Sequence, residues 1–444
     1  MDEPFAARIR DRSAGIGVVG LGYVGMPLAM AYADAGFTVS GLDVSDERVA
    51  LLRRGESYLM DVPSSNVRGH VEARRFVPTT DYGNLAAADV IFVCVPTPFD
   101  RSKAPDLSYV EAAARGLAGV LRQGQLIILE STTYPGTTEE VLVPLLERSG
   151  LAAGKDFWVA FSPERIDPGN KRFTIANTPK VVGGIDAEST ERAAFVLEQV
   201  GATAAVHRVS GPKVAELTKL LENTFRAVNI ALVNELAMLC DRMHIDVWEV
   251  IEAAKTKPYG FMAFYPGPGV GGHCIPVDPY YLSWKAREYD FSTKFIEIAA
   301  ETNLEMPFFT VDKIRRTLRQ VGKPLLGAKI LVLGAAFKRD IDDGRNSAAV
   351  RVMEILSDEG VEVCYHDPYI PWVTISTDEG VASSRELRSV ELTEEIVRSV
   401  DCVAILVGHS NVDYGTIIAN AGLVFDAVNA AAGLPRQGTS VVRL

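Results

Sequence analysis

GIGVVGLGYVGMPLAMAYADAGFTVSGLD, residues 15–43, is the stretch that decides the fold of this 444-residue chain. It predicts a short apolar strand over 15–20, a glycine-rich turn, a helix that stops at Gly36, and a second strand over 37–43. Helical patterns separate most of the further strand candidates, which are DVIFVCVP (89–96), QLIILEST (125–132) and FWVAFSP (157–163). Alternating strands and helices predict a parallel sheet with helices on both faces.

The turn GLGYVG supplies Gly20, Gly22 and Gly25 between the first strand and the helix. The first glycine permits the tight turn, the second lets a pyrophosphate approach the backbone, and the third allows close helix–strand packing. Asp43 ends the second strand, where a carboxylate accepts hydrogen bonds from an adenosine ribose and repels a 2′-phosphate. This pattern therefore predicts an NAD-binding domain, and the alternative is a purely structural turn.

A long helix is predicted from PKVAELTKLLENTFRAVNIALVNELAMLCDRM (212–243), which contains no interior glycine or proline. Its apolar residues recur at steps of three and four: Val214, Leu217, Leu221, Phe225, Val228 and Leu232. We expect this helix to join two α/β domains or to pack on a second subunit. A coiled coil is the weaker alternative, because sustained heptads are missing.

The α/β pattern resumes near residue 325. Four further strands are predicted over 328–334, 361–368, 401–408 and 423–429. The predicted fold class is α/β, with two doubly wound Rossmann-like domains joined by a long central helix or helical domain. The expected domains are an NAD-binding domain (1–210), a central helical domain (211–315) and a C-terminal domain (316–444).

The composition favours a cytoplasmic protein. The formal net charge is 45 − 57 = −12, without a long basic run, which argues against binding to nucleic acid or to an anionic membrane. The first residues lack the apolar stretch of a signal peptide, and no apolar run approaches the roughly 20 residues that span a bilayer. Five cysteines in so long a chain do not form a disulfide framework, and the six histidines have no metal-ligand spacing, so no metal is expected.

Cys274 lies in GGHCIPVDP (271–279), directly after the glycine-rich loop PGPGVGG (266–272). A thiol on a loop with so few side chains is accessible to a substrate carbon. Asp278, four residues further on, is placed to order a water or to orient a proton acceptor. The alternative is a small buried residue beside a turn.

Several further motifs are distributed over nearly the whole chain. With the two already described, they are GLGYVG (20–25), DVSDERVALLRRG (43–55), CVPTP (94–98), ESTTYPGTTEE (130–140), SPERIDPG (162–169), KLLENTFRAVN (219–229), YPGPGVGGHCIPVDPYYL (265–282) and AAFKRDIDDGR (335–345). Together these motifs resemble those of the UDP-sugar 6-dehydrogenases. The resemblance is greatest to the bacterial enzymes of surface-polysaccharide pathways that act on UDP-N-acetylglucosamine. Many UDP-glucose dehydrogenases have a glutamate where this chain has Pro168, which weakens the UDP-glucose interpretation.

The resemblance implies a four-electron oxidation of UDP-N-acetyl-D-glucosamine at C6 that consumes two NAD and passes through a thiohemiacetal and a thioester on Cys274. UDP-N-acetylmannosamine, UDP-N-acetylgalactosamine and UDP-glucose remain alternative substrates, since motifs barely constrain the epimer. Two other classes remain open: a single-step hydroxyacid dehydrogenase, which needs no thiol, and a catalytically silent nucleotide-sugar sensor.

The resemblance also implies roles for individual residues. Lys219 and Asn223 stabilise the developing oxyanion, Asp278 and Thr132 hold the catalytic water, and Glu164 contacts the reacting region. The predicted substrate-binding residues are Glu164, Arg165, Lys219, Asn223, Tyr265, Gly271 and Lys338. The predicted cofactor-binding residues are Gly20, Gly22, Tyr23, Val24, Gly25, Asp43, Arg48, Pro96, Thr97, Thr132 and Arg345.

Two of these residues carry further expectations. The arginine that matches Arg345 reaches the NAD of a neighbouring subunit, so a homodimer or higher homo-oligomer is expected. For Tyr265, contact with the nucleotide and simple aromatic packing are equal alternatives.

Overall fold

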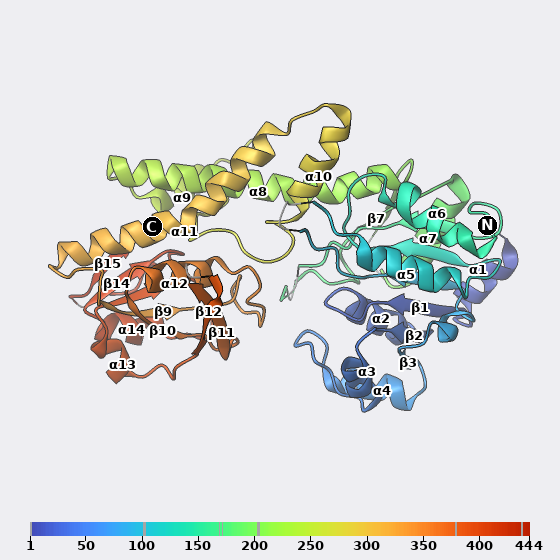
Figure 1. The fold of residues 1–444 in the computed structure, drawn as a ribbon, viewed down its shortest axis with the longest axis horizontal. Helices are drawn as coiled ribbons and strands as arrows, with labels where there is room; N and C mark the ends of the chain where they lie inside the picture. The colour runs from blue at the N-terminus through green and yellow to red at the C-terminus, as the bar shows by residue number, and fades with distance from the viewer. Residues whose placement is uncertain are drawn as a thin grey trace. The chain divides into compact units, whose positions relative to one another are not determined.

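The computed structural model describes residues 2–100, 104–167, 169–170, 172–201, 205–377, 380–436 and 438–444 (Figure 1). Pro168 therefore lies outside the described residues. The chain divides into two compact units, and each is described by itself. Unit 1 comprises Met1–Glu222 and Tyr280–Ser292, and unit 2 comprises Asn223–Pro279 and Thr293–Leu444.

The described part of unit 1 contains an eight-stranded sheet. Its strands are β1 (Gly15–Val19), β2 (Thr38–Leu42), β3 (Phe76–Thr79), β4 (Val90–Val93), β5 (Leu126–Leu129), β6 (Trp158–Phe161), β7 (Lys180–Gly184) and β8 (Val206–Arg208). They follow the order β3-β2-β1-β4-β5-β6-β7-β8, and only the β6–β7 pair is antiparallel among these described strands. The first six strands have the order of a dinucleotide-binding sheet, which reverses direction between β1 and β4.

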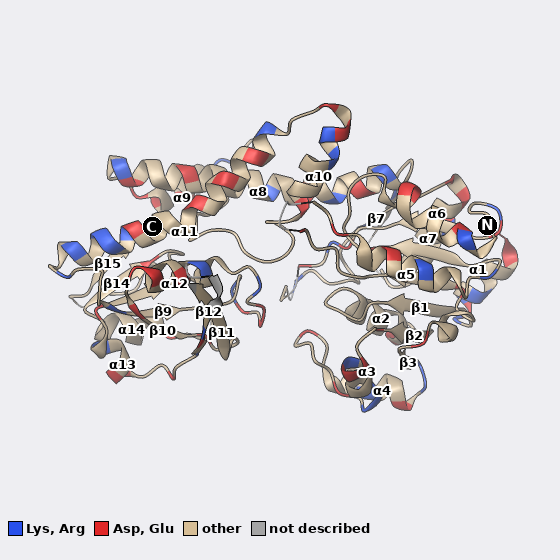
Figure 2. Ribbon diagram, viewed as in Figure 1, with Lys and Arg blue, Asp and Glu red and all other residues tan. Residues whose placement is uncertain are grey.

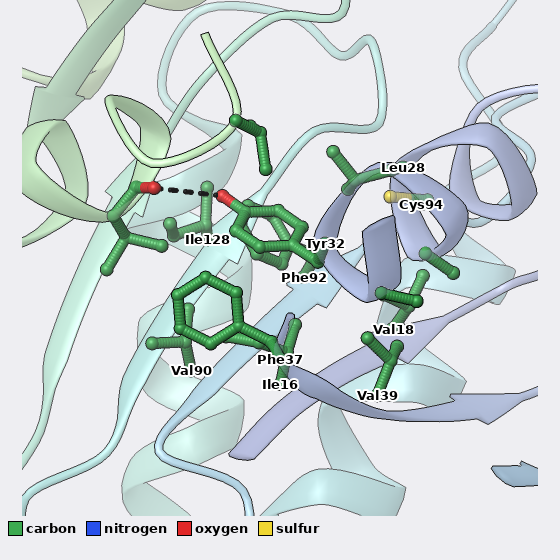
Figure 3. Packing of buried hydrophobic residues seen from close by; sticks show 14 of the residues in the cluster. Ile16, Val18, Leu28, Tyr32, Phe37, Val39, Val90, Phe92, Cys94 and Ile128 are labelled. Carbon is green, nitrogen blue, oxygen red and sulfur yellow. Dashed lines mark hydrogen bonds between the residues drawn. The ribbon is translucent and has the colours of Figure 1, made fainter. Parts of the chain in front are cut away.

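Both faces of this sheet are buried, as expected for parallel strands. Successive residues of β4 point to opposite sides, so Val90 and Phe92 belong to one core cluster while Ile91 and Val93 belong to another. Figure 3 shows the first cluster, in which Tyr32 packs against Phe92 with ring centroids 5.1 Å apart. The described α-helices of unit 1 that precede α8 are α1 (Glu3–Arg10), α2 (Gly25–Asp34), α3 (Asp46–Arg53), α4 (Ser64–Glu72), α5 (Ser108–Ala118), α6 (Val143–Leu146) and α7 (Ala187–Leu197).

Unit 2 contains a second parallel sheet of five described strands. They are β9 (Lys329–Leu333), β10 (Glu362–His366), β13 (Cys402–Ile405), β14 (Leu423–Asp426) and β15 (Ser440–Arg443). Their order, β10-β9-β13-β14-β15, is the other common doubly wound arrangement. An antiparallel hairpin of β11 (Trp372–Thr377) and β12 (Gly380–Arg388) and the helices α12 (Ala348–Asp358), α13 (Glu394–Ser399) and α14 (Tyr414–Asn420) complete this part.

The helical middle of the chain consists of α8 (Pro212–Met243), α9 (Val247–Lys255), α10 (Asp278–Ala286) and α11 (Lys294–Gln320). The 32-residue α8 begins in unit 1 and continues into unit 2. The predicted fold class and the predicted long helix are confirmed, whereas α11 was not predicted. Neither α8, α11 nor any other helix in the described ranges combines the length and apolar content needed to cross a membrane.

The apolar positions that predicted α8 are largely exposed in the structure. The α8 stripe consists of Val214, Leu217, Leu221, Phe225, Leu232, Leu236, Leu239 and Met243, all at least 40% exposed. The buried face carries mainly small or polar residues, among them Ala215, Ala227, Ala231 and Ala237. The long helix is therefore confirmed, but the eight apolar side chains of the α8 stripe are exposed in the described part of the chain, while Leu220 and Val233 of the same helix are buried.

Candidate active site

The glycine turn of unit 1 has the backbone geometry that its sequence predicts. Gly20 has φ +90°, and a Cβ there would lie 2.6 Å from the Cys94 carbonyl oxygen. A Cβ at Gly25 would lie 1.9 Å from the Gly20 oxygen, whereas a Cβ at Gly22 would meet nothing within 4 Å. The open side of the turn at Gly22, at the start of α2, thus fits a pyrophosphate. The two residues inside the turn, Tyr23 and Val24, are half-buried.

Asp43 lies beside this turn at the end of β2 and is 6% exposed. Its Oδ2 accepts the Leu21 N–H and its Oδ1 accepts the Ser45 N–H, both at 3.0 Å. The Arg48 guanidinium lies 3.7 Å from the carboxylate and 5.3 Å from the centroid of the Tyr58 ring. Burial and the Asp43 charge raise the pKa of Tyr58, so its hydroxyl donates to the Leu21 oxygen. The carboxylate retains acceptor capacity for a ribose hydroxyl.

The loops that follow β4 and β5 are joined by a hydrogen bond between two predicted site residues. Thr97 Oγ1 donates to the main-chain oxygen of Thr132 at 2.7 Å. The Tyr281 hydroxyl, on α10, donates to the main-chain oxygen of Thr97. Pro96 is exposed between these contacts. Because ligands of doubly wound sheets bind at the carboxyl ends of the strands, these loops lie where a nicotinamide is expected.

Glu164 and Lys219 are also brought together in unit 1. The Lys219 ammonium donates to the main-chain oxygen of Glu164 at 2.5 Å, and both residues are buried. The Glu164 carboxylate accepts the N–H groups of Arg165 and Ile166 and the Lys180 ammonium. Burial alone would raise the pKa of Glu164, but Lys180 and these N–H groups lower it. In this structure Glu164 therefore contacts Lys219 through its backbone, not its carboxylate.

Two glutamates of α8 anchor the helix in unit 1. Glu222 forms an ion pair of 2.7 Å with Arg165, a predicted substrate-binding residue. Glu216, which was not predicted, is fully buried and accepts the N–H groups of Gly136 and Thr138 at 2.6 and 2.9 Å. Burial raises the pKa of Glu216 in spite of these hydrogen bonds. The helix that carries Lys219 is thus tied to the loop that contains Thr132.

Cys274, Asp278 and Asn223 are brought together in unit 2. The main-chain oxygen of Cys274 accepts the N–H groups of Val277 and Asp278 at 3.1 and 2.8 Å, so the cysteine occupies the turn that begins α10. The thiol residue is half-buried, whereas Asp278 is 3% exposed. The Asn223 side-chain amide donates to Oδ2 of Asp278. A partly accessible thiol therefore lies on the same turn as a carboxylate whose orientation is fixed.

The glycine-rich loop before Cys274 is hydrogen-bonded to the segment that follows β9. The Gly272 N–H donates to the Arg345 oxygen at 3.2 Å, and Asn346 Nδ2 donates to the Gly272 oxygen at 3.1 Å. A Cβ at Gly271 would lie 2.7 Å from Cβ of Phe337. Gly271 is therefore required for close packing, in addition to its predicted place near the substrate.

Lys338 and Arg345 lie on this same segment. Lys338 is half-buried. The Arg345 guanidinium forms an ion pair of 2.6 Å with Asp343 and lies 3.4 Å from Nδ1 of His273. Arg345 is thus positioned by Asp343 beside the residue that precedes Cys274.

Tyr265 contacts α9 in this structure. Its ring stacks on Trp248 with centroids 6.0 Å apart, and its hydroxyl donates to Glu252 and accepts from Lys255. Of the two alternatives for Tyr265, nucleotide contact and aromatic packing, these contacts agree with aromatic packing.

Asp367 and His409 form a buried pair in unit 2 that was not predicted. Asp367 follows β10 as Asp43 follows β2, and its Oδ2 accepts the N–H groups of Ala335 and Ala336 at 2.6 and 3.0 Å. Burial alone would raise the pKa of Asp367, but His409 and the N–H groups lower it to about 2. In the sequence, the only signal for the buried pair was that Asp367 lies at the end of the predicted strand over 361–368.

The two doubly wound sheets, the glycine turn open to a pyrophosphate and the loop thiol define the class as a dinucleotide-dependent oxidoreductase. Three family models match the chain: the NAD binding domain (residues 14–200), the central domain (213–305) and the UDP binding domain (331–432) of the UDP-glucose/GDP-mannose dehydrogenase family. The chain belongs to this family. It is therefore an NAD-dependent dehydrogenase of UDP-sugars, as its sequence predicts.

Individual relatives are named as dehydrogenases of N-acetylated UDP-sugars. A UDP-N-acetyl-D-glucosamine 6-dehydrogenase of Pseudomonas aeruginosa is 39% identical over 80% of this chain and 83% of its own length. A UDP-N-acetyl-D-mannosamine dehydrogenase of Pyrococcus horikoshii is 38% identical over 80% of this chain and 84% of its own. The solved structure of UDP-D-ManNAc dehydrogenase from Pyrococcus horikoshii gives a TM-score of 0.85 at 32% identity, covering 97% and 98% of the two chains.

Proposed function

We propose that this chain oxidises UDP-N-acetyl-D-glucosamine at C6 to the uronate, with Cys274 as the residue that carries the sugar between the two oxidations. The observation that supports this most is the turn at Cys274, which combines a partly accessible thiol with the buried Asp278–Asn223 pair. A dehydrogenase that stopped at the aldehyde or ketone would need a base but no such thiol.

Bound NAD supplies the hydride acceptor for each of the two oxidations. In the first, C6 loses a hydride and its hydroxyl loses a proton, which gives an aldehyde. The Cys274 thiolate then adds to C6, and the carbonyl oxygen takes up a proton to give a thiohemiacetal. Loss of a second hydride and of that proton leaves a thioester. Water adds to the thioester carbon and the C–S bond breaks, which releases the carboxylate, the Cys274 thiolate and the two protons of the water.

Charged and polar side chains are proposed to stabilise the oxygen at C6 during these steps. Lys219 and Asn223 are four residues apart on α8 and thus one turn apart on one side of the helix. Lys219 is held by the Glu164 carbonyl and Asn223 by Asp278. Such preorganised donors stabilise an oxyanion without reorganisation. Asp278 is proposed to hold the hydrolytic water together with Thr132.

The remaining site residues keep the roles that the sequence predicts, as part of this proposal. The dinucleotide is assigned to Gly20, Gly22, Tyr23, Val24, Gly25, Asp43, Arg48, Pro96, Thr97, Thr132 and Arg345. The UDP-sugar is assigned to Glu164, Arg165, Lys219, Asn223, Gly271 and Lys338, with Tyr265 as a weaker candidate because it packs on Trp248. The domains are proposed to be 1–210, 211–315 and 316–444.

The choice of sugar is supported by the N-acetylated sugars in the relatives' names and by the motif GGHCIPVDP. UDP-N-acetyl-D-mannosamine is the second candidate, because a relative of nearly equal identity carries that name. Surface-polysaccharide precursor synthesis in the cytoplasm is the proposed setting, which suits five cysteines that form no disulfide with one another in the described part of the chain.

A homodimer is proposed from the α8 stripe. Eight large apolar side chains on one helix, each at least 40% exposed, form the kind of surface that a second subunit covers. Figure 2 shows that charged residues are spaced along α8 between longer uncharged stretches.

One assay tests the reaction. Purified protein receives NAD and each candidate UDP-sugar in turn, and the NADH formed per sugar consumed is counted. We expect two NADH and a uronate, with the highest kcat/KM for UDP-N-acetyl-D-glucosamine. One NADH per sugar with a released aldehyde or ketone contradicts the proposal. A preference for UDP-N-acetyl-D-mannosamine changes the proposed substrate but leaves the proposed reaction unchanged.

A variant tests the thiol. Cys274→Ala should bind NAD and the UDP-sugar normally but lose steady uronate formation. Full turnover by this variant would remove the thiol from the mechanism. Cys364→Ala is the matched control, since Cys364 is also half-buried but lies in β10.

A further inference from the structure

Lys180 is a buried cation that neither the resemblance nor the proposed mechanism uses. It is the first residue of β7 and is 3% exposed. Its ammonium lies 2.9 Å from Oε2 of Glu164 and 3.7 Å from Oε1 of Glu130. An ammonium so deeply buried is costly to desolvate, and it persists here because two carboxylates surround it. Burial alone would lower the pKa of Lys180, but the two carboxylates raise it, so the side chain stays charged.

The two carboxylates around Lys180 differ in their other contacts. Glu164 Oε1 accepts two backbone N–H groups at 2.7 and 2.6 Å, whereas Oε1 of Glu130 has no hydrogen-bond partner in the described part of the chain. Burial, only partly opposed by Lys180, raises the pKa of Glu130 to about 7. Below pH 7 the Glu130 side chain is therefore mainly an uncharged carboxylic acid. The charges of the Lys180 ammonium and the Glu164 carboxylate then cancel, so the cluster of three side chains has no net charge.

The cluster acts on Lys219 through the backbone. The Glu164 carboxylate bonds the two N–H groups that follow it, so the turn after β6 is held by its own side chain. The carbonyl oxygen of that same residue accepts the Lys219 ammonium. Any movement of the Glu164 side chain therefore moves the acceptor that orients Lys219.

We infer that Lys180 is a positioning residue for Lys219: its ammonium fixes the Glu164 turn, and the carbonyl oxygen of that turn aims the Lys219 ammonium at the reacting oxygen. This inference rests on the proposed role of Lys219 as an oxyanion donor. Glu130 is the competing partner, because its ionised form draws Lys180 away from Glu164. The other titratable groups facing Glu130 are the Cys94 thiol, 3.8 Å away, and the buried hydroxyl of Tyr32.

Lys180→Met tests the inference, because it keeps the length of the side chain and removes the charge. The matched control is Lys313→Met, since Lys313 is another buried lysine, paired with Asp241 at 3.0 Å in unit 2. Both variants should lose thermal stability. Only Lys180→Met should lose kcat, by about tenfold or more, because small misplacements of a catalytic group are costly. KM for the UDP-sugar and the affinity for NAD should change less than about twofold, and Lys180→Arg should restore kcat.

The pH–rate profile adds a measurement that a purely structural role would not change. Without Lys180 the buried Glu164 carboxylate takes up a proton more readily, so the acid limb of kcat should move up by about one pH unit or more. Lys180→Arg should leave that limb in place. Equal kcat losses in Lys180→Met and Lys313→Met, or no rescue by arginine, would overturn the inference.

Glu130→Gln provides a second test that does not depend on a folded Lys180→Met. It mimics the protonated acid, so its kcat should match that of the wild type at pH 6 and exceed it at pH 8, where ionised Glu130 competes for Lys180. Superimposable profiles from pH 6 to 8 would overturn the inference. Lys219→Ala distinguishes a failure of the proposed function from a failure of this inference. If Lys219→Ala keeps wild-type kcat, the proposed role of Lys219 as an oxyanion donor fails together with the inference about Lys180. If it loses kcat while Lys180→Met does not, only the present inference fails.

Discussion

The imidazole Nε2 of His409 lies 3.0 Å from Oδ2 of Asp367, and both side chains are almost completely buried. Nδ1 of the same ring accepts the backbone N–H of Asp340 at 3.0 Å. Nδ1 therefore carries no proton, and Nε2–H must be the donor to the carboxylate. This neutral tautomer ties the end of β10 to the segment that carries Lys338.

His409→Ala should therefore weaken UDP-sugar binding. Loss of the ring frees the Asp340 backbone and lets the Lys338 segment move, so we expect KM for the UDP-sugar to rise about tenfold, equivalent to one lost buried hydrogen bond. NAD affinity, measured by calorimetry, should not change. His366→Ala is the matched control, because its ring contacts the Val390 oxygen instead. An unchanged KM in His409→Ala would contradict this role.

Asp367 should make the stability of the protein depend on pH in acid. Its pKa is lowered to about 2 in the folded protein, so it contributes stability above the unfolded pKa near 3.8, and this is lost as the pH falls toward 2. The shift corresponds to roughly 2 kcal/mol. Asp367→Asn should be less stable than the wild type at pH 6 in denaturant titrations. The difference should shrink as the pH approaches 2, and a constant difference would exclude this carboxylate as the cause.

The elements that the sequence predicted are those with an uninterrupted local pattern. The apolar runs of the central strands and the unbroken periodicity of α8 need no knowledge of tertiary contacts. In contrast, α11 contains Pro307, which interrupts a helical pattern although its missing N–H is tolerated in the folded chain. The edge strands β3 and β15 have four residues each, of which two are apolar, so they do not stand out as apolar runs.

The residues of the candidate site also divide into those that a local sequence pattern predicts and those that depend on tertiary contacts. Motifs indicated Cys274 and Asp278, which lie on one turn, because short-range spacing is visible in the sequence. The contacts of Lys180 with Glu130 could not be predicted, since they depend on which strands lie side by side in the folded sheet. Charged residues at the ends of apolar strands were the only signal.

Two alanine variants should separate binding from folding in the glycine turn. Gly22→Ala meets no atom within 4 Å in the protein itself, so it should fold normally but lose NAD affinity, because the methyl group occupies the approach of the pyrophosphate. Gly25→Ala should lower the melting temperature sharply, since its Cβ would lie 1.9 Å from the Gly20 oxygen. Gly69→Ala, in open space on α4, is the control. Normal NAD affinity in Gly22→Ala would refute the assignment of this turn.

A second glycine pair tests the loop before Cys274. Gly271→Ala places a methyl group 2.7 Å from Cβ of Phe337 and 2.8 Å from the Asn346 oxygen, so the loop must shift. We expect kcat to fall about tenfold or more, because a shift of this size moves the thiol from its attack position. Gly267→Ala meets nothing within 4 Å and should keep its activity. Equal activities of the two variants would show that the loop tolerates displacement.

The α8 stripe predicts how the subunits associate. Leu232 is 54% exposed near the middle of the helix, and a buried leucine contributes about 2 kcal/mol, which a two-fold contact doubles. Leu232→Glu should therefore shift the protein from dimer to monomer in sedimentation velocity at micromolar concentration. Leu326→Glu is the matched control, because Leu326 is 73% exposed but lies outside α8, and this variant should stay dimeric. A dimer that survives Leu232→Glu and the further change Leu239→Glu must use another surface. If Arg345 acts across the interface, the Leu232→Glu monomer should also lose NAD affinity.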